Sequence, residues 1–246
     1  MSAPDIIDEV SLLDNHCHGD PRLIARREPW MDAVLEDNDL PATIERLGSP
    51  LNIVHSQPMQ RNIAALDQVA ASHELDFRVF FARKANKCLS FVESAATAGA
   101  GIDVASENEL RQVLGCGIAG RDVICTAAIK SESLLRVCLD HDVVVAIDNR
   151  DELDLIQHLS ADGRRRIAIR ISGFNHDGEK LPSRFGVDID DITDFLERID
   201  CHATDIAGLH FHLDGYCPRQ RVSAIRQSLA LIEPIRQRGH SVKFLD

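Results

Sequence analysis

From residue 51 onward, short apolar runs alternate with segments in which apolar residues recur every three or four positions. The fully apolar run at residues 143–147 predicts a buried strand, and helical spacing within residues 59–72 predicts a helix. The other predicted strands are residues 51–54, 77–84, 102–105, 122–125, 167–171, 206–212 and 242–245, and the other predicted helices are residues 89–98, 106–114, 131–140, 151–159, 190–199 and 219–237. Apolar strands that alternate with helices are typical of a parallel sheet covered by helices.

The number of predicted strands indicates the fold class. Seven of them, from residue 77 to residue 245, follow one another in the order of an α/β fold, the (β/α)8 TIM-type barrel, which needs eight strands to close. We therefore expect a barrel truncated after its seventh strand, either because the chain is a fragment or because another polypeptide completes it. Residues 1–50 are irregular and polar, and we interpret them as an N-terminal extension of a barrel domain at residues 51–246.

Composition narrows the class of partner. The net charge is −12, which disfavours nucleic acid and anionic membranes because both bind basic surfaces. No apolar run is long enough to span a membrane, and the acidic N-terminus is unlike a signal peptide. Seven cysteines without a CxxC pair indicate reduced thiols, so we expect a cytoplasmic protein that acts on a small molecule.

Polar residues with catalytic potential follow the predicted strands. Lys84 ends the apolar run at residues 79–82, and an amine in low dielectric is a better nucleophile that can form a Schiff base with an aldehyde. The other candidates are Asp103, Asp148, Arg170, His210, His212 and Asp246 at strand ends, with Glu109 in the helix after Asp103. Because reactive residues of α/β barrels lie at the carboxyl ends of the strands, we expect these side chains to converge on one mouth.

Two other patterns suggest different chemistry. His16 and His18 are two residues apart and could chelate a metal, as the His-x-His of metal-dependent amidohydrolases does. Two ligands do not complete a metal site, so we predict none and keep the hydrolase as an alternative. Residues 115–120 carry the letters of a dinucleotide fingerprint, but a helix is predicted before them and a strand after them. The fingerprint needs the opposite order, and we discount it.

Four ordered motifs resemble one family. They are Phe-Ala-Arg-Lys-Ala-Asn at residues 81–86, the stretch at residues 99–110, Ser-Arg-Phe-Gly at residues 183–186 and Gly-Leu-His-Phe-His at residues 208–212. From about residue 49 to residue 246, the chain resembles the barrel portion of the pyridoxal-phosphate-dependent decarboxylases of ornithine, diaminopimelate and arginine. These enzymes share the alanine-racemase-like barrel.

The resemblance implies a decarboxylase that uses pyridoxal 5′-phosphate and acts on a basic or diamino amino acid. It also implies a homodimer when a C-terminal domain is present. Lys84 would form the internal aldimine with the cofactor and His212 would stack on the cofactor ring, so these are the implied catalytic residues. The implied cofactor-binding residues are Lys84, Asp103, Glu109, Arg170 and His212.

The sequence departs from the family just after His212. The family has a glycine and then a serine two and three positions beyond this histidine, with the serine near the phosphate. Here Asp214 and Gly215 stand in those places, followed by Tyr216. A carboxylate at this position would repel a phosphate. The family's glycine-rich phosphate loop would follow Asp246. An inactive barrel relative that acts as an interaction or regulatory protein is therefore the alternative, and a racemase of the same fold is another.

Overall fold

The computed structural model describes residues 28–160, 163–215 and 217–246. The chain divides into two compact units, Met1–His55 and Ser56–Asp246, near the boundary predicted at residue 50. The metal-binding pattern proposed for His16 and His18 lies outside the described residues, as does Tyr216.

The described part of the first unit carries two short helices, α2 (Pro29–Leu35) and α3 (Leu40–Leu47). The rings of Trp30 and His55 stack with their centroids 5.2 Å apart. The strand predicted at residues 51–54 is wrong, because these residues form no ladder with any described strand. An apolar run becomes a strand only where a neighbour accepts its backbone hydrogen bonds, which the local pattern cannot reveal.

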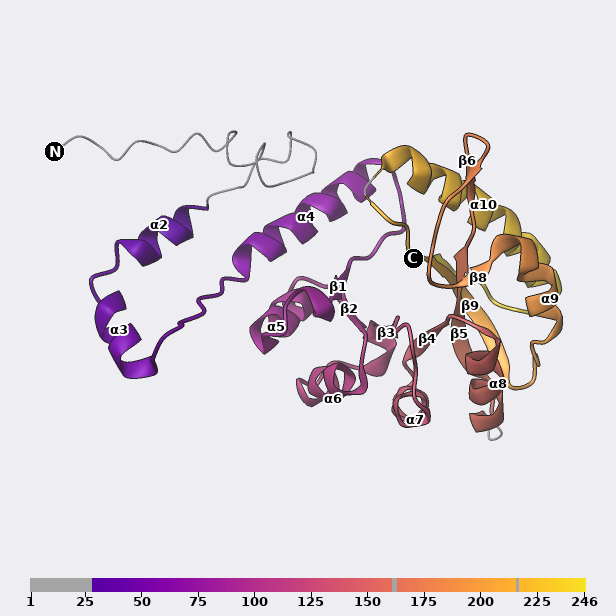
Figure 1. Ribbon diagram of the computed structural model, residues 1–246, viewed down its shortest axis with the longest axis horizontal. Coiled ribbons are helices and arrows are strands. Elements are labelled where there is room, and N and C mark those ends of the chain that lie inside the picture. The colour runs from indigo at the N-terminus through magenta and orange to yellow at the C-terminus, as the bar shows by residue number, and fades with distance from the viewer. Residues whose placement is uncertain (1–27, 161–162, 216) are drawn as a thin grey trace. The chain divides into compact units, whose positions relative to one another are not determined.

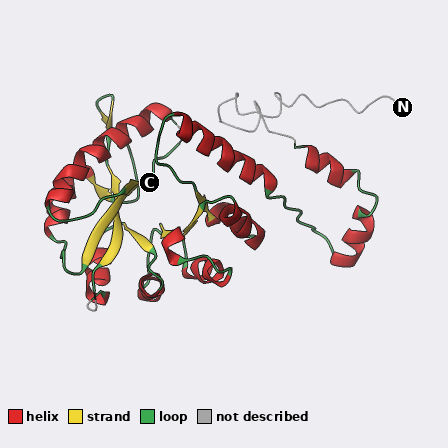
Figure 2. Ribbon diagram, turned by 180° about the vertical axis from the view of Figure 1, so that it is seen from behind, coloured by secondary structure: helices red, strands yellow, loops and turns green. Residues whose placement is uncertain are grey.

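The second unit is built on a parallel sheet whose strands follow the order of the sequence (Figures 1 and 2). The path runs β1-β2-β3-β4-β5-β9-β10, with β8 beside β5, and a separate hairpin pairs β6 with β7. The strands are β1 (Phe80–Ala82), β2 (Gly101–Val104), β3 (Val123–Cys125), β4 (Val144–Ile147), β5 (Arg165–Ser172), β6 (Asn175–His176), β7 (Glu179–Lys180), β8 (Val187–Asp188), β9 (Thr204–Phe211) and β10 (Phe244–Leu245). The α/β class and the sequential barrel order are thus confirmed.

Helices connect successive strands and cover the outside of the sheet. They are α4 (Gln57–Ser72), α5 (Leu89–Thr97), α6 (Glu107–Gly115), α7 (Glu132–Asp140), α8 (Arg150–Leu159), α9 (Ile192–Glu197) and α10 (Pro218–Gln237), with 3₁₀ turns η1 (Arg83–Ala85), η2 (Gly120–Asp122) and η3 (Ile189–Asp191). Figure 1 shows α5, α6, α7 and α8 following one another along the row of strands β1 to β5. Each strand can therefore deliver its carboxyl end to the same side of the sheet.

Three of these helices begin with a capping side chain. The side chains of Ser106, Ser131 and Asn149 each accept a hydrogen bond from the backbone N–H three residues further on, and so cap α6, α7 and α8. Residues 115–120 join the end of α6 to the turn before β3, which is the helix-then-strand order that argued against a dinucleotide site.

Two layers of side chains pack the sheet. Branched residues such as Val104, Ile147 and Ile169 are fully buried in the larger core cluster, to which α5 to α8 also contribute. The other face uses small residues beside large rings: Ala146 and Ala168 pack with Phe244. A Cβ atom on Gly208 would overlap the Phe244 ring, so glycine is required there.

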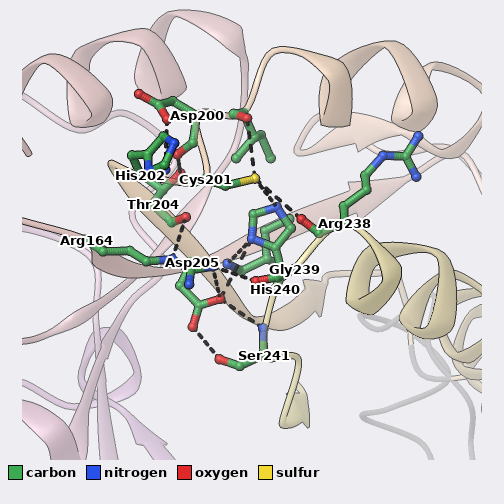
Figure 3. A network of polar contacts seen from close by, with 12 residues as sticks. Arg164, Asp200, Cys201, His202, Thr204, Asp205, Arg238, Gly239, His240 and Ser241 are labelled. Carbon is green, nitrogen blue, oxygen red and sulfur yellow. Dashed lines mark hydrogen bonds and ion pairs between the residues drawn. The ribbon is translucent and has the colours of Figure 1, made fainter.

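A polar network joins the amino end of β9 to the loop before β10 (Figure 3). The Asp205 carboxylate accepts hydrogen bonds from the Ser241 N–H at 2.9 Å, from the Ser241 hydroxyl and from Arg164 Nη2 at 3.1 Å. Burial alone would raise the pKa of Asp205, but the hydrogen bonds from Ser241 and the charge of Arg164 outweigh it and hold this pKa below its usual range.

His240 extends the same network to a cysteine. The Ile206 N–H donates to His240 Nδ1 at 3.3 Å, so a neutral imidazole carries its proton on Nε2. That nitrogen faces Cys201 Sγ at 3.6 Å (Figure 3). In this tautomer His240 cannot take a proton from Cys201. We therefore interpret the cluster of Asp205, His240 and Cys201 as a structural contact between β9 and the loop before β10, and not as a catalytic triad.

Candidate active site

A cavity of about 400 Å³ opens at the carboxyl ends of the strands. Its lining includes most of the residues predicted from the strand ends: Lys84, Asp103, Arg170, His210, His212 and Asp246. Phe80, Thr126, Phe185 and Phe211 complete much of the remaining wall. The expected convergence on one mouth is confirmed for this set.

Lys84 reaches the cavity differently from the prediction. Strand β1 ends at Ala82, and the chain then turns through η1, which carries Lys84. Arg83 takes the buried position of the turn with 1% of its surface exposed, whereas Lys84 is exposed at the cavity. The expectation that Lys84 ends a buried strand in low dielectric is therefore wrong. A 3₁₀ turn changes which residue faces inward, and the apolar run does not encode that change.

Arg170 on β5 organises the floor of the cavity. Its Nη1 donates to Asp148 Oδ1 at 2.6 Å, its Nη2 donates to the Thr126 carbonyl at 2.7 Å, and its Nε donates to His210 Nδ1 at 3.1 Å. Arg170 and Asp148 are both buried, so their ion pair is shielded from solvent. One guanidinium thus connects the ends of β3, β4, β5 and β9.

Asp103 stands beside Thr126 at the ends of β2 and β3. The Thr126 hydroxyl donates to Asp103 Oδ1 at 2.6 Å. Burial raises the pKa of Asp103, and the hydrogen bond and the charges of Lys84 and Arg170 only partly oppose it. The Asp103 carboxyl is therefore able to hold a proton at higher pH than an ordinary aspartate.

His210 and Asp246 face each other across β9 and β10. His210 Nε2 lies 3.6 Å from Asp246 Oδ2, and Arg170 already donates to the other ring nitrogen. Burial, with the charges of Arg170, His212 and Lys84, lowers the pKa of His210 to about 3, so this imidazole is neutral at pH 7. Burial and the nearby Asp103 carboxylate raise the pKa of Asp246 to about 6.

His212 lies at the rim of the cavity with an aromatic neighbour. Its ring meets Phe185 edge to face with centroids 5.9 Å apart, and Arg170 lies over the same Phe185 ring at 5.3 Å. Burial and the charges of Lys84 and Arg170 lower the pKa of His212, while the Asp214 carboxylate opposes them. The exposed Asp214 is therefore close enough to act on His212 electrostatically.

Glu109 does not lie on the cavity wall. Its carboxylate accepts from the Ala105 N–H at 2.8 Å and pairs with Lys87, so it ties the start of α6 to the lysine-bearing loop. Its predicted cofactor contact stays a prediction, and the structure gives it a supporting position instead.

Two polar features of the site were not predicted. Thr126 directly follows β3, and the same strand-end rule would have found it had uncharged residues been included. The Lys130–Glu152 pair, 2.8 Å apart with both side chains buried, joins the loop that follows β3 to α8. Only the tertiary fold brings these two residues together, so the sequence carries no local signal for the pair.

The described residues contain no group of three or more His, Cys, Asp or Glu side chains placed to hold a metal ion. Among the helices of the described ranges, none is both long and apolar enough to cross a membrane. A second cavity of about 310 Å³ lies between α4, the segment that precedes β1 and the turn that follows α5, and its described lining holds no lysine or histidine.

A sequential parallel barrel sheet with a lysine, carboxylates, an arginine and histidines at its carboxyl ends defines an α/β protein with an enzyme-like site. Residues 59–246 match the family described as "Pyridoxal-dependent decarboxylase, pyridoxal binding domain", and the chain belongs to this family. The family uses pyridoxal phosphate, and the recognition made from the four motifs is confirmed for the barrel portion.

Individual relatives are similar to this chain over most of its length. The chain is 33% identical over 204 residues to "Uncharacterized protein y4yA" of Sinorhizobium fredii (strain NBRC 101917 / NGR234), covering 82% of this chain and 44% of that protein. It is 26% identical over 218 residues to an ornithine decarboxylase of Caenorhabditis elegans, covering 83% of this chain and 51% of that protein. The chain spans about half the length of the curated relatives that it matches.

A solved structure supports the fold. The lysine/ornithine decarboxylase of Vibrio vulnificus, complexed with putrescine, superposes with a TM-score of 0.70 at 23% identity, covering 84% of this chain and 54% of that one. At this identity the likeness shows the barrel fold alone.

Proposed function

We propose that the cavity binds pyridoxal 5′-phosphate through Lys84 and that the protein is an amino-acid decarboxylase. The observation that carries this proposal is the position of Lys84, whose amine shares one cavity with Asp103, Arg170 and His212. The donor set suits the cofactor: an exposed amine can bond to its aldehyde, and imidazole and carboxyl groups can meet its ring. Membership of a pyridoxal-binding family makes this cofactor the first choice.

Four residues of the cavity would have different roles in the proposed site. Lys84 supplies the amine that holds the cofactor, and His212, steadied by Phe185, offers an imidazole face at the rim. Arg170 fixes the strand ends, and Asp103 provides a carboxyl group that can hold or release a proton. Bound pyridoxal phosphate would supply an electron sink that stabilises the carbanion left by loss of carbon dioxide.

We further propose a basic or diamino amino acid as the substrate, and a homodimer as the working form. The carboxylates of Asp103 and Asp246 in the cavity favour a substrate with a positive charge, because opposite charges attract most strongly where water is excluded. The relative named above as an ornithine decarboxylase favours the same class. The dimer rests on the family resemblance.

Asp214 favours a second candidate, a barrel relative without catalytic activity. Its exposed carboxylate acts on His212, so negative charge lies near the place where the cofactor would sit. A phosphate that approached this loop would meet repulsion. In this case the protein would serve as an interaction or regulatory protein.

The test is carbon dioxide release from carboxyl-labelled ornithine, lysine, arginine and diaminopimelate in the presence of pyridoxal 5′-phosphate. We expect release from at least one substrate, and reduction to the buffer level in Lys84→Ala. The matched control is Lys243→Ala, which changes an exposed lysine directly before β10. No release from any substrate would favour the inactive relative, and loss of optical purity without release would indicate a racemase.

A further inference from the structure

Arg83, the residue before Lys84, is an unusual buried cation. It is one of the largest fully buried side chains of the described residues, with 1% of its surface exposed, although arginine is rarely buried without a charged partner. Its hydrogen-bond acceptors are both uncharged: Nη1 donates to the Asn86 carbonyl at 3.3 Å, and Nη2 donates to the Gln112 amide oxygen.

The remaining donor of Arg83 adds to the cost of this arrangement. Within residues 28–160, 163–215 and 217–246, the buried Nε atom has no protein acceptor, and no carboxylate pairs with the guanidinium. Burying a charge without a counter-charge opposes folding, so stability alone does not explain an arginine at this position. Such costs are often found beside functional sites, where they fix a required geometry.

The contacts of Arg83 enclose the turn that carries Lys84. Arg83 begins η1 and bonds to the carbonyl of Asn86, which directly follows it, so the guanidinium closes the turn around Lys84. The bond to Gln112 anchors this closed turn to α6.

A second contact of the same kind lies one helical turn away on α6. Glu109 is three residues before Gln112, so both lie on one face of the helix, and Glu109 pairs with Lys87 just beyond the turn. The helix therefore holds the loop on both sides of Lys84. Lys84 itself is exposed, and no hydrogen bond within the described residues fixes its amine.

We propose that Arg83 is a positioning residue, which holds the η1 turn against α6 so that the Lys84 amine points into the cavity. The proposal rests on the proposed function, because it concerns the amine that would hold pyridoxal phosphate. It adds a role for a buried side chain that does not touch the cavity. The Arg83 guanidinium would orient Lys84 by holding the backbone of the turn, because the Lys84 amine itself is not held by a hydrogen bond within the described residues.

The experiment measures where pyridoxal phosphate becomes attached. The folded full-length protein is mixed with limiting pyridoxal 5′-phosphate, reduced with borohydride and digested, and the label on Lys84 is divided by the label on Lys243. In Arg83→Met, which keeps the volume and removes the buried charge, we expect this ratio to fall about tenfold, while the thermal midpoint stays level or rises. Loss of structure would also bring the ratio down towards one, so the unchanged thermal midpoint is what separates a misplaced Lys84 from an unfolded variant.

Two variants at Gln112 separate positioning from stability. Gln112→Leu removes one of the two Arg83 contacts, and we expect the ratio to fall by about threefold. Gln112→Glu keeps an acceptor for Arg83 and should preserve the wild-type ratio. If Arg83→Met fails to fold, the comparison of Gln112→Leu with Gln112→Glu tests the positioning role of Arg83 in its place.

The outcomes are distinguishable. An unchanged ratio in Arg83→Met, or in Gln112→Leu if the first variant is unfolded, would overturn the positioning role of Arg83. If the wild-type protein itself shows no preference for Lys84, the proposed cofactor function fails instead.

Discussion

At the scale of single residues, Arg170 carries the geometry of the candidate site. Its three donor groups contact Asp148, the Thr126 carbonyl and His210, so three other strand ends depend on one side chain. Asp148 is buried, and without Arg170 it would be left as a carboxylate without its counter-charge. Such an uncompensated charge is more costly than the loss of an exposed pair.

We therefore predict that Arg170→Met lowers the free energy of unfolding by about 3 kcal/mol, as measured by urea denaturation at pH 7. Arg166→Met is the control, since Arg166 lies on the same strand and pairs with Asp142 at 2.9 Å on the exposed surface. It should cost far less. Equal losses of unfolding free energy in Arg170→Met and Arg166→Met would show that the buried Arg170 network contributes no more to stability than an exposed ion pair.

Several site residues could be predicted because they follow apolar strands. Asp103, Arg170, His210 and His212 are polar interruptions at positions where a barrel places its reactive groups, and the structure gathers them on one cavity. The burial of Arg83 and the exposure of Lys84 could not be predicted. It depends on a three-residue 3₁₀ turn, whose direction is set by contacts with α6 that are distant in the sequence.

At the scale of elements, the hydrophobic period predicted the helices and most strands of the second unit. It overestimated β1, which ends at Ala82 because the turn begins at Arg83. It failed at residues 51–54, which have the composition of a strand but lack a partner. Periodicity indicates which residues are buried, whereas a strand also needs an adjacent strand with which its backbone can form hydrogen bonds.

The network at the amino end of β9 gives an element-scale prediction with a defined pH dependence. The pKa of Asp205 is lower in the folded state than in the unfolded chain, so ionised Asp205 stabilises the fold above about pH 4. This stabilisation is lost as the pH falls through the folded-state pKa. We predict that Asp205→Asn costs about 1–2 kcal/mol at pH 7 and that the difference from wild type shrinks at pH 3.5.

Urea unfolding at the two pH values measures this effect. The control is Asp142→Asn, since Asp142 also pairs with an arginine but is exposed. A pH-independent penalty in Asp205→Asn would mean that the Asp205 charge is not what joins β9 to the loop before β10.

At the scale of the whole molecule, the barrel sheet and its carboxyl-end cavity both belong to the second unit. The family match covers residues 59–246 and so falls within the same unit. The sequence allowed the fold class to be predicted because successive apolar strands and capped helices repeat the same unit. The four motifs added the family, which periodicity alone could not supply.

The division into two units leads to a prediction about folding. All of the buried hydrophobic residues in the described part of the chain lie between Ile63 and Val242. Residues 56–246 should therefore fold without residues 1–55, with a helical circular dichroism spectrum and a thermal midpoint within about 4 °C of the 246-residue chain. A molten or aggregated product would contradict the independence of the second unit.

The most direct test of the cofactor assignment is borohydride reduction of the protein with pyridoxal 5′-phosphate, followed by peptide mapping of the adduct. The account predicts one dominant labelled lysine, Lys84, because its amine alone among the described lysines lines the strand-end cavity. Label spread over several lysines, or its absence from Lys84, would contradict the assignment of a pyridoxal phosphate site to this cavity.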